Sequence, residues 1–261
     1  MSPALTDVAV AALAARAAAD VLLPLLRAGR LHDTALGDAG DAAAQQAIAG
    51  VLAAHRPGDA VFSEEAVDDP ARVSADRVWI VDPLDGTREY RAGDRYDWAV
   101  HVALWERSAG SRAAGDDGEG DLTAAAVGLP ALGEVLTTDP APVVPPVPDG
   151  PLRVTVSRSR PPAQARAAAA ALDAVLVPLG SAGYKTLAVV RGEADAYVHA
   201  GGMYQWDSAA PVAVARAAGL HTCRLDGSPL RYNVADAWLP DLVVCRPELA
   251  ERVLAAVRPP A

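Results

Sequence analysis

The sequence predicts an α/β fold, and three observations support it. Alanine- and leucine-rich segments with apolar residues at helical spacing are separated by short apolar runs typical of strands. In the C-terminal half the two kinds of segment alternate, as in layered α/β proteins. A chain of 261 residues, 51% hydrophobic and 21% charged, is long enough to bury a large core.

The N-terminal half begins with two predicted helices, over residues 5–28 and 41–54. The apolar runs that follow predict strands at residues 60–63, 78–81, 98–105, 122–128 and 134–138. The polar stretch 108–121 lacks the Asp-x-Asp-x-Asp-Gly spacing of a calcium loop, so we expect an exposed hairpin loop there.

A proline-rich segment, residues 140–151, has the composition of a linker. We therefore expect two α/β halves, residues 1–139 and residues 152–261. The second half predicts strands at residues 152–157, 175–179, 194–199, 221–224 and 242–245. Its predicted helices cover residues 162–172, 182–191, 207–218 and 247–257.

Composition and charge limit the kinds of molecule that this protein is expected to bind. A net charge of −10 disfavours the binding of nucleic acid polymers. A small phosphate ester could still bind, because a bound metal ion can invert the local negative field. The first 30 residues lack a basic stretch before a clean apolar run, and no uninterrupted apolar run has the length of a membrane span, so we expect neither a signal peptide nor membrane binding. Cys223 and Cys245 are far apart and have no metal-type spacing, which favours the reducing cytoplasm.

Two aspartates follow directly after the predicted strand 78–81, in the run DPLDGT at residues 82–87. An ordinary strand-to-helix turn would explain one of them, with Asp85 or Thr87 as the helix N-cap. It does not explain Asp82, because a carboxylate at the end of a buried strand is costly unless it is paired or metal-bound. The run therefore indicates a site for a hard cation and a phosphate.

The run DPLDGT resembles the Asp-Pro-(Ile/Leu)-Asp-Gly-Thr signature of the lithium-sensitive, magnesium-dependent phosphatases related to inositol monophosphatase. The next residues, Arg88-Glu89-Tyr90, resemble the Lys/Arg-Glu-Phe of the CysQ-type 3'(2'),5'-bisphosphate nucleotidases, with Tyr in place of Phe. The resemblance covers nearly the whole chain. It implies a five-layer α-β-α-β-α sandwich with the active site between the two halves.

The resemblance also implies a set of metal ligands. The segment WDSAA at residues 206–210 is similar to the family's second signature, Trp-Asp-x-Ala-Ala. The implied ligands are the carboxylates of Glu64, Asp82, Asp85 and Asp207 and the backbone carbonyl of Leu84. They would hold roughly two or three Mg²⁺ ions, with Mn²⁺ as a substitute and Li⁺ as an inhibitor.

In the family, a threonine and an upstream aspartate position the attacking water. The resemblance assigns these roles to Thr87 and Asp41. Residues 35–41 match the family's Ser-Pro-Val-Thr-x-Ala-Asp poorly, so Asp38 is the alternative. Asp41 could also simply cap the helix predicted at 41–54.

The phosphate and nucleotide contacts come from three segments. The backbone N–H groups of Gly86 and Thr87 at a helix start favour a phosphate, with Arg88 beside them. The segment VSRSR at residues 156–160 resembles the Thr-Arg-Ser-His of bisphosphate nucleotidases, and it implicates Ser159 and Arg160.

The third segment, GSAGYK at residues 180–185, resembles the family's Gly-Ser-Ala-Gly-x-Lys. We expect Ser181 at the helix start to receive a second phosphate, or simply to cap the helix, and Lys185 to lie one turn further on. Lys185 is the only lysine among 23 basic residues, which suggests a position that arginine cannot fill.

The resemblance therefore implies a cytoplasmic Mg²⁺-dependent phosphatase, as a monomer or homodimer. Its expected substrate is 3'-phosphoadenosine 5'-phosphate, from which it would remove the 3'-phosphate, with the sulfated precursor as a further substrate. The alternatives are hydrolysis of inositol 1-phosphate or fructose 1,6-bisphosphate on the same fold, and a catalytically inactive relative that senses nucleotide or metal.

Overall fold

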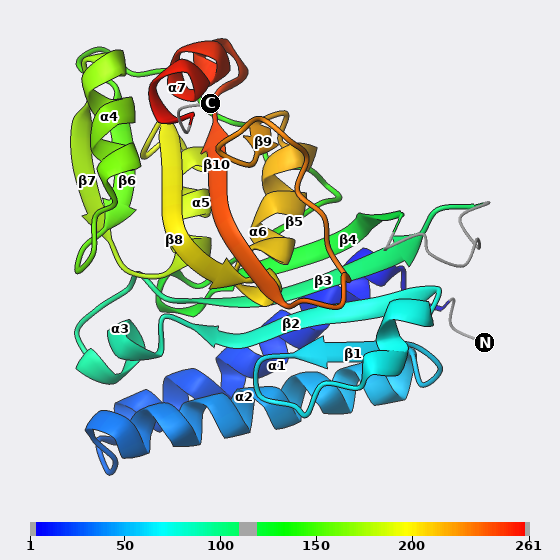
Figure 1. The fold of residues 1–261 in the computed structure, drawn as a ribbon. Helices are drawn as coiled ribbons and strands as arrows, with labels where there is room; N and C mark the ends of the chain where they lie inside the picture. The colour runs from blue at the N-terminus through cyan, green and yellow to red at the C-terminus, as the bar shows by residue number, and fades with distance from the viewer. Residues whose placement is uncertain (1–3, 110–118, 259–261) are drawn as a thin grey trace.

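Two five-stranded sheets are stacked between layers of helices in the computed structural model, which describes residues 4–109 and 119–258 (Figure 1). Sheet A has the strand order β1-β2-β3-β4-β5, with β1 and β2 parallel and the other pairs antiparallel. Its strands are β1 (Ala60–Ser63), β2 (Arg77–Asp85), β3 (Ala99–Arg107), β4 (Gly120–Leu129) and β5 (Glu134–Thr137).

Sheet B is built from the chain that follows the proline-rich segment, in the order β7-β6-β8-β10-β9. Strand β6 pairs in parallel with β7 and β8, and β10 pairs antiparallel with β8 and β9. The strands are β6 (Arg153–Ser157), β7 (Val175–Leu179), β8 (Ala196–Tyr204), β9 (His221–Cys223) and β10 (Trp238–Cys245).

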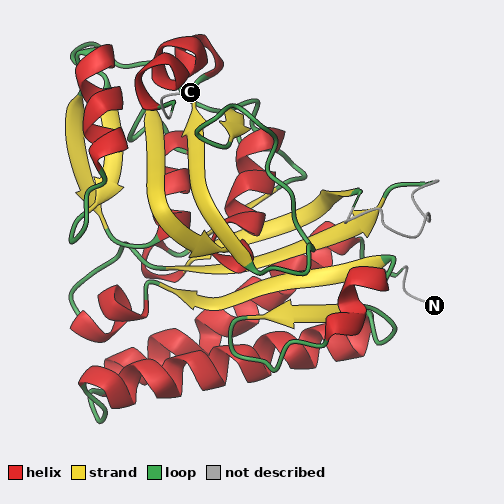
Figure 2. Ribbon diagram, in the orientation of Figure 1, coloured by secondary structure: helices red, strands yellow, loops and turns green. Residues whose placement is uncertain are grey.

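The helices form three layers, which Figure 2 shows in red. Helices α1 (Asp7–Ala28) and α2 (Asp33–His55) cover the outer face of sheet A. Helices α5 (Ala182–Val190) and α6 (Gln205–Ala217) lie between the sheets, and α4 (Ala163–Leu172) and α7 (Ala250–Val257) cover sheet B from outside. The five-layer α-β-α-β-α order is therefore confirmed. Short α3 (Thr87–Ala92) and the 3₁₀ turns Pro70–Ser74, Pro130–Leu132 and Pro247–Leu249 complete the fold.

Alternating residues of β2 explain why its stretch Val78–Val81 is apolar at every position. Trp79 and Val81 pack toward α1 and α2, whereas Val78 and Ile80 pack into the core between the sheets. Side chains on a strand point to opposite faces in turn, so a strand covered on both faces needs apolar residues at every position. The core between the sheets draws on both halves of the chain, and the division at residues 140–151 stays a prediction.

The prediction for the second helix was wrong at its start. Helix α2 begins at Asp33, so Asp41 lies in its interior and does not cap it. Gly37 and Gly40 lie inside the first part of α2 although glycine lowers helix propensity. Both glycines are needed because α2 passes close to the DPLDGT turn: a Cβ atom on Gly40 would lie 2.8 Å from Cε1 of Tyr90.

Other boundaries differ less. Strand β2 continues through Asp85, so the signature itself ends the strand, and β8 extends beyond 199 to Tyr204. The predicted last helix opens with the 3₁₀ turn Pro247–Leu249. Most of the expected hairpin loop at 108–121 lies outside the described residues. Cys223 and Cys245 are buried free thiols.

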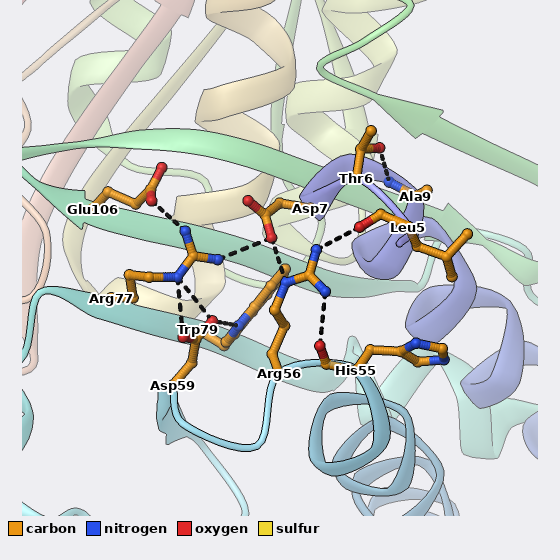
Figure 3. Close-up of polar contacts among 10 residues, drawn as sticks. All are labelled: Leu5, Thr6, Asp7, Ala9, His55, Arg56, Asp59, Arg77, Trp79 and Glu106. Atoms are coloured by element: carbon orange, nitrogen blue, oxygen red, sulfur yellow. Dashed lines mark hydrogen bonds and ion pairs between the residues drawn. The ribbon is translucent and has the colours of Figure 1, made fainter. Parts of the chain in front are cut away.

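A polar network ties the start of α1 to sheet A (Figure 3). Arg56, after α2, donates to Asp7 at 2.6 Å, and Arg77, at the start of β2, donates to the same oxygen at 2.9 Å. Arg77 also binds Asp59 at 3.0 Å and pairs with Glu106. By length and composition alone α1 could cross a membrane, but here one side of it is buried against α2 and sheet A.

The close passage of α2 predicts opposite effects for two glycine-to-alanine changes in one helix. Gly40→Ala should destabilise the protein by about 1–3 kcal/mol, because the added methyl group meets Tyr90 and Leu84. Gly50→Ala, with no atom within 4 Å of the new Cβ, should stabilise it by about 0.5–1 kcal/mol. Urea unfolding of both variants measures this, and a stabilising Gly40→Ala would refute the packing described here.

Candidate active site

The DPLDGT run forms a rigid turn where β2 leaves sheet A. The pairing of β2 with β3 is irregular between Asp82 and Asp85, which lets the strand turn away. Within the turn, the backbone N–H of Leu84 donates to Asp82 Oδ1 at 3.1 Å, and the Thr87 hydroxyl donates to the Leu84 carbonyl at 3.1 Å. Gly86 has φ of 89°, a left-handed conformation that favours glycine, and caps α3.

Three carboxylates meet at this turn, two of them from sheet A and one from α6. One oxygen each of Asp82, Asp85 and Asp207 lies within 4.8 Å of the others. Asp82 and Asp85 come from sheet A, whereas Asp207 comes from the first turn of α6, which packs between the sheets. Asp82 is fully buried and Asp85 is 8% exposed. The structure thus brings three of the four predicted carboxylates together, and their role as metal ligands stays a prediction.

Backbone amides hold two of these carboxylates in place. Asp85 accepts hydrogen bonds from Gly183 at 2.6 Å and Ala182 at 3.3 Å, both in the first turn of α5. Asp207 accepts from the backbone N–H of Tyr204 at 2.5 Å, so it also caps α6. The positive end of a helix stabilises such a negative charge.

Burial and mutual repulsion raise the pKa values of Asp82, Asp207 and Glu64. For Asp82 burial is the largest cause, followed by the charges of Glu64, Asp85 and Asp207, and its pKa lies well above the usual range. The same effects raise the pKa of Asp207 to about 8. Glu64 follows β1 at the rim of the cluster, and partial burial with repulsion from Asp85 raises its pKa to about 7.

The donor set fits a hard divalent cation. All the carboxylates carry oxygen ligands, and Asp82 Oδ2 is buried without a hydrogen-bond partner among the described residues. A buried, unpartnered carboxylate oxygen is costly unless a cation meets it. Mg²⁺ and Mn²⁺ prefer oxygen ligands of this kind.

A fully buried histidine, which the sequence analysis did not assign to the site, packs against the cluster. His101 in β3 pairs in register with Asp82, and its Nε2 lies 3.3 Å from Asp85 Oδ2. Its Nδ1 lies 3.1 Å from the backbone carbonyl of Trp206. Burial lowers the pKa of His101, and its Nε2 has no hydrogen-bond partner among the described residues. The antiparallel register of β2 and β3, which would have placed it, was not predicted.

Thr87 and Asp41 also face each other. The Thr87 hydroxyl oxygen lies 3.4 Å from Asp41 Oδ1, on the side of α2 that packs against the turn. Burial, and then the charge of Glu65, raise the pKa of Asp41 to about 7. Asp38, the alternative, is exposed, and its charge contributes to the raised pKa of Asp41. The geometry therefore favours Asp41 over Asp38 as the partner of Thr87.

The start of α5 adjoins the same turn. A Cβ atom on Gly86 would lie 2.9 Å from Cβ of Ser181, so the two residues touch. The Ser181 hydroxyl accepts from Tyr184 N at 2.8 Å and thus caps the helix. Lys185 is buried, donates to the carbonyls of Gly180 and Ser181, and has a pKa lowered to about 8 by burial. Its role as a phosphate contact stays a prediction.

An arginine-rich pocket of about 310 Å³ lies beside α3. It is lined by Arg88, Glu89, Ala92, Arg95, Arg158 and Ser159, so it includes two of the predicted substrate residues. Asp97, buried and not predicted, accepts from Arg158 at 2.5 Å, Arg95 at 3.0 Å and Gly180 N at 2.7 Å. Arg160 lies outside the pocket lining and is exposed.

The position of Asp97 in the sequence could have identified it as a candidate site residue. It stands directly before an apolar strand, as Asp82 stands at the end of one, and a carboxylate in such a place needs partners. Of the two arginines that bind it, Arg95 stands two residues before it, whereas Arg158 comes from a segment distant in the sequence, so only the pairing with Arg158 required the fold.

Comparison with known proteins agrees with this geometry. The model of the inositol monophosphatase family matches residues 5–259. Among solved structures, an inositol monophosphatase from Zymomonas mobilis superposes with a TM-score of 0.72 at 24% identity, covering 96% of this chain and 97% of that one. CysQ from Bacteroides thetaiotaomicron gives a TM-score of 0.74 at 24% identity, covering 91% and 96%. The chain belongs to the inositol monophosphatase family.

Curated relatives of this chain carry names that specify a substrate. A protein of Mycobacterium leprae (strain TN) named 3'-phosphoadenosine 5'-phosphate phosphatase is 50% identical over 97% of this chain and 94% of its own. The 3'(2'),5'-bisphosphate nucleotidase CysQ of Shigella flexneri is 30% identical over 77% of this chain and 81% of its own. The predicted likeness to CysQ-type enzymes is thereby confirmed.

The raised pKa values predict how the metal-free protein responds to pH. In the unfolded chain these carboxyl groups titrate near pH 4, whereas Glu64 and Asp207 titrate at about 7 and 8 in the fold. The folded state therefore holds more protons, and the free energy of unfolding should fall by about 1 kcal/mol or more from pH 5 to pH 8. Mg²⁺ should restore it, and more so at pH 8, because the ligands must be deprotonated.

Urea unfolding at the two pH values, with a chelator or with MgCl₂, tests this expectation. Sodium chloride at matched ionic strength is the control for screening. Equal effects of the two salts would mean that the cluster does not bind Mg²⁺ specifically.

Proposed function

We propose that this protein is a Mg²⁺-dependent phosphatase that hydrolyses the 3'-phosphate of 3'-phosphoadenosine 5'-phosphate, giving AMP and phosphate. The observation that carries the proposal is the meeting of Asp82, Asp85 and Asp207 beside the Thr87–Asp41 pair. The names of the relatives with 50% and 30% identity support the substrate.

The metal ligands in this proposal are the carboxylates of Glu64, Asp82, Asp85 and Asp207 and the Leu84 carbonyl, with Mn²⁺ as a substitute for Mg²⁺ and Li⁺ as an inhibitor. When bound, such ions neutralise charge on the phosphoryl oxygens and leaving oxygen and lower the pKa of a water. The protein's own part is to keep the ligands in place, through the α5 amides on Asp85 and the Tyr204 amide on Asp207.

Thr87 and Asp41 orient the attacking water and take its proton. A carboxyl group with a pKa of about 7 is well matched to accept a proton near neutral pH. The Thr87 hydroxyl is within donating distance of both the Leu84 carbonyl, at 3.1 Å, and Asp41 Oδ1, at 3.4 Å, and its lone pairs accept from the attacking water. The proton of the water passes to Asp41, and the water oxygen attacks the phosphorus as the bond between phosphorus and the 3'-oxygen breaks. The 3'-oxygen takes a proton from solvent and leaves as the 3'-hydroxyl of AMP.

The backbone N–H groups of Gly86 and Thr87 hold the phosphate that is cleaved, at the start of α3. Arg88 and Ser159 line the arginine-rich pocket and contact the nucleotide there. Arg160 lies outside this lining, and we propose it as a further phosphate donor. Ser181, at the start of α5 and in contact with Gly86, receives the nucleotide's second phosphate, and Lys185 one turn further on compensates the surrounding carboxylates. The buried free thiols agree with a protein of the reducing cytoplasm.

A comparison of three substrates tests the proposal. Phosphate release is measured with Mg²⁺ on 3'-phosphoadenosine 5'-phosphate, inositol 1-phosphate and fructose 1,6-bisphosphate, each with and without Li⁺. We expect the highest kcat/KM for the nucleotide, and loss of that activity in Li⁺. A preference for inositol 1-phosphate or the sugar bisphosphate would overturn the proposed substrate.

The same assay separates the two candidate bases. Asp41→Asn should lower kcat by about 10²–10⁴-fold, the usual contribution of a general base. Asp38→Asn removes an equal charge from the same helix, and should leave kcat within a few-fold of wild type because Asp38 is exposed and does not contact Thr87. Equal effects of the two changes would remove Asp41 from the mechanism.

A further inference from the structure

A buried arginine outside the carboxylate cluster joins the elements that carry its ligands. Arg72 lies in the 3₁₀ turn Pro70–Ser74 and is only 2% exposed. Its one carboxylate partner among the described residues is Asp68, 2.7 Å from Nε and 41% exposed. A buried guanidinium is costly unless its donors are satisfied, so its other partners matter.

Those other partners come from the second half of the chain. Arg72 Nη1 donates to Asn233 Oδ1 at 3.0 Å and to the Val234 carbonyl at 3.1 Å. Asn233 returns a hydrogen bond from Nδ2 to the Arg72 carbonyl at 3.2 Å. Asn233 is fully buried, so no solvent competes for these bonds. The 3₁₀ turn after Glu64 is thereby fixed to the segment before β10.

The same segment is fixed to the start of α6. Gln205, the first residue of α6, accepts from Asn233 N at 2.7 Å and donates to the carbonyls of Val234 at 3.2 Å and Asp236 at 2.6 Å. Gln205 is fully buried and stands two residues before Asp207. The hydrogen-bond chain therefore runs from Arg72 to the helix turn that carries a cluster carboxylate.

Aromatic contacts make a second connection between the same elements. The Arg72 guanidinium lies 3.6 Å from the ring centroid of Phe62 in β1. The Phe62 ring meets the ring of Trp206 edge-on, with centroids 5.1 Å apart and an interplanar angle of 70°. Phe62 stands two residues before Glu64, and Trp206 stands one before Asp207.

We propose that Arg72 is a positioning residue that sets the separation between Glu64, at the end of β1, and Asp207, at the start of α6. It does so through two connections, the Asn233–Gln205 hydrogen bonds and the Phe62–Trp206 contact. The inference rests on the proposed metal-binding function of the cluster. The planar guanidinium is required, because lysine has the charge but not the fork that reaches two acceptors while its face lies on a ring.

The test compares metal affinity with stability. Arg72→Lys and Arg72→Met are compared with Arg246→Met, which removes another buried guanidinium. Arg246 follows the C-terminal end of β10, whereas the N-terminal end of β10 pairs with Tyr204. Arg246 binds Asp195 at 3.1 Å and the Pro145 carbonyl at 2.8 Å. Mn²⁺ dissociation constants are measured by calorimetry on metal-free protein, together with Tm and with kcat as a function of Mn²⁺ concentration.

We expect both Arg72 variants to bind Mn²⁺ about tenfold or more weakly, as is usual when residues that orient metal ligands are changed. High Mn²⁺ should restore much of kcat in Arg72→Lys. Arg246→Met should lower Tm with an unchanged dissociation constant. Wild-type affinity in Arg72→Lys, or an equal loss of affinity in Arg246→Met, would overturn the proposal.

These outcomes separate the inference from the proposed function. If wild-type protein binds Mn²⁺ but does not hydrolyse the nucleotide, the function fails and the Arg72 inference is still tested by the dissociation constants. If wild-type protein binds no Mn²⁺, the inference falls together with the metal site.

Discussion

Repulsion among buried carboxylates is the constraint around which this protein is organised. Asp82, Asp85 and Asp207 have oxygens within 4.8 Å of one another, and water screens them weakly because Asp82 and Asp85 are buried and Asp207 is half-buried. Such an arrangement opposes folding unless protons or cations neutralise it. The fold therefore concentrates negative charge at one place, which favours the binding of a divalent cation there.

Several elements hold the cluster together against this repulsion. The first turn of α5 directs two amides at Asp85, the first turn of α6 closes on its own Asp207, and His101 fills the space between them. Helix α2 can approach the turn closely because Gly40 carries no side chain. The two sheets and the helices between them matter for function because they bring these short-range contacts into one place.

Much of this could be predicted from the sequence. Apolar spacing gave most strands and helices, and the DPLDGT and WDSAA runs identified Asp82, Asp85 and Asp207. Local patterns failed where long-range packing decides: the second helix was expected to begin at residue 41, yet α2 begins at Asp33, with Gly37 against Thr87 and Gly40 against Tyr90.

Pairings across the fold were also out of reach of the sequence. His101 faces Asp82 only because of the register of β2 with β3, and Arg72 finds Asn233 across more than half of the chain. Neither pair has a sequence spacing that a motif could record. The arginine-rich pocket arises in the same way, from α3 and the segment after β6.

A crystal structure grown with Mn²⁺, with anomalous scattering recorded at the manganese edge, tests the central claim most directly. The account predicts anomalous peaks bridging the carboxylates of Asp82, Asp85 and Asp207, with a ligand oxygen from Glu64. A structure with Mn²⁺ bound elsewhere, or with the cluster free of anomalous density at saturating Mn²⁺, would contradict it.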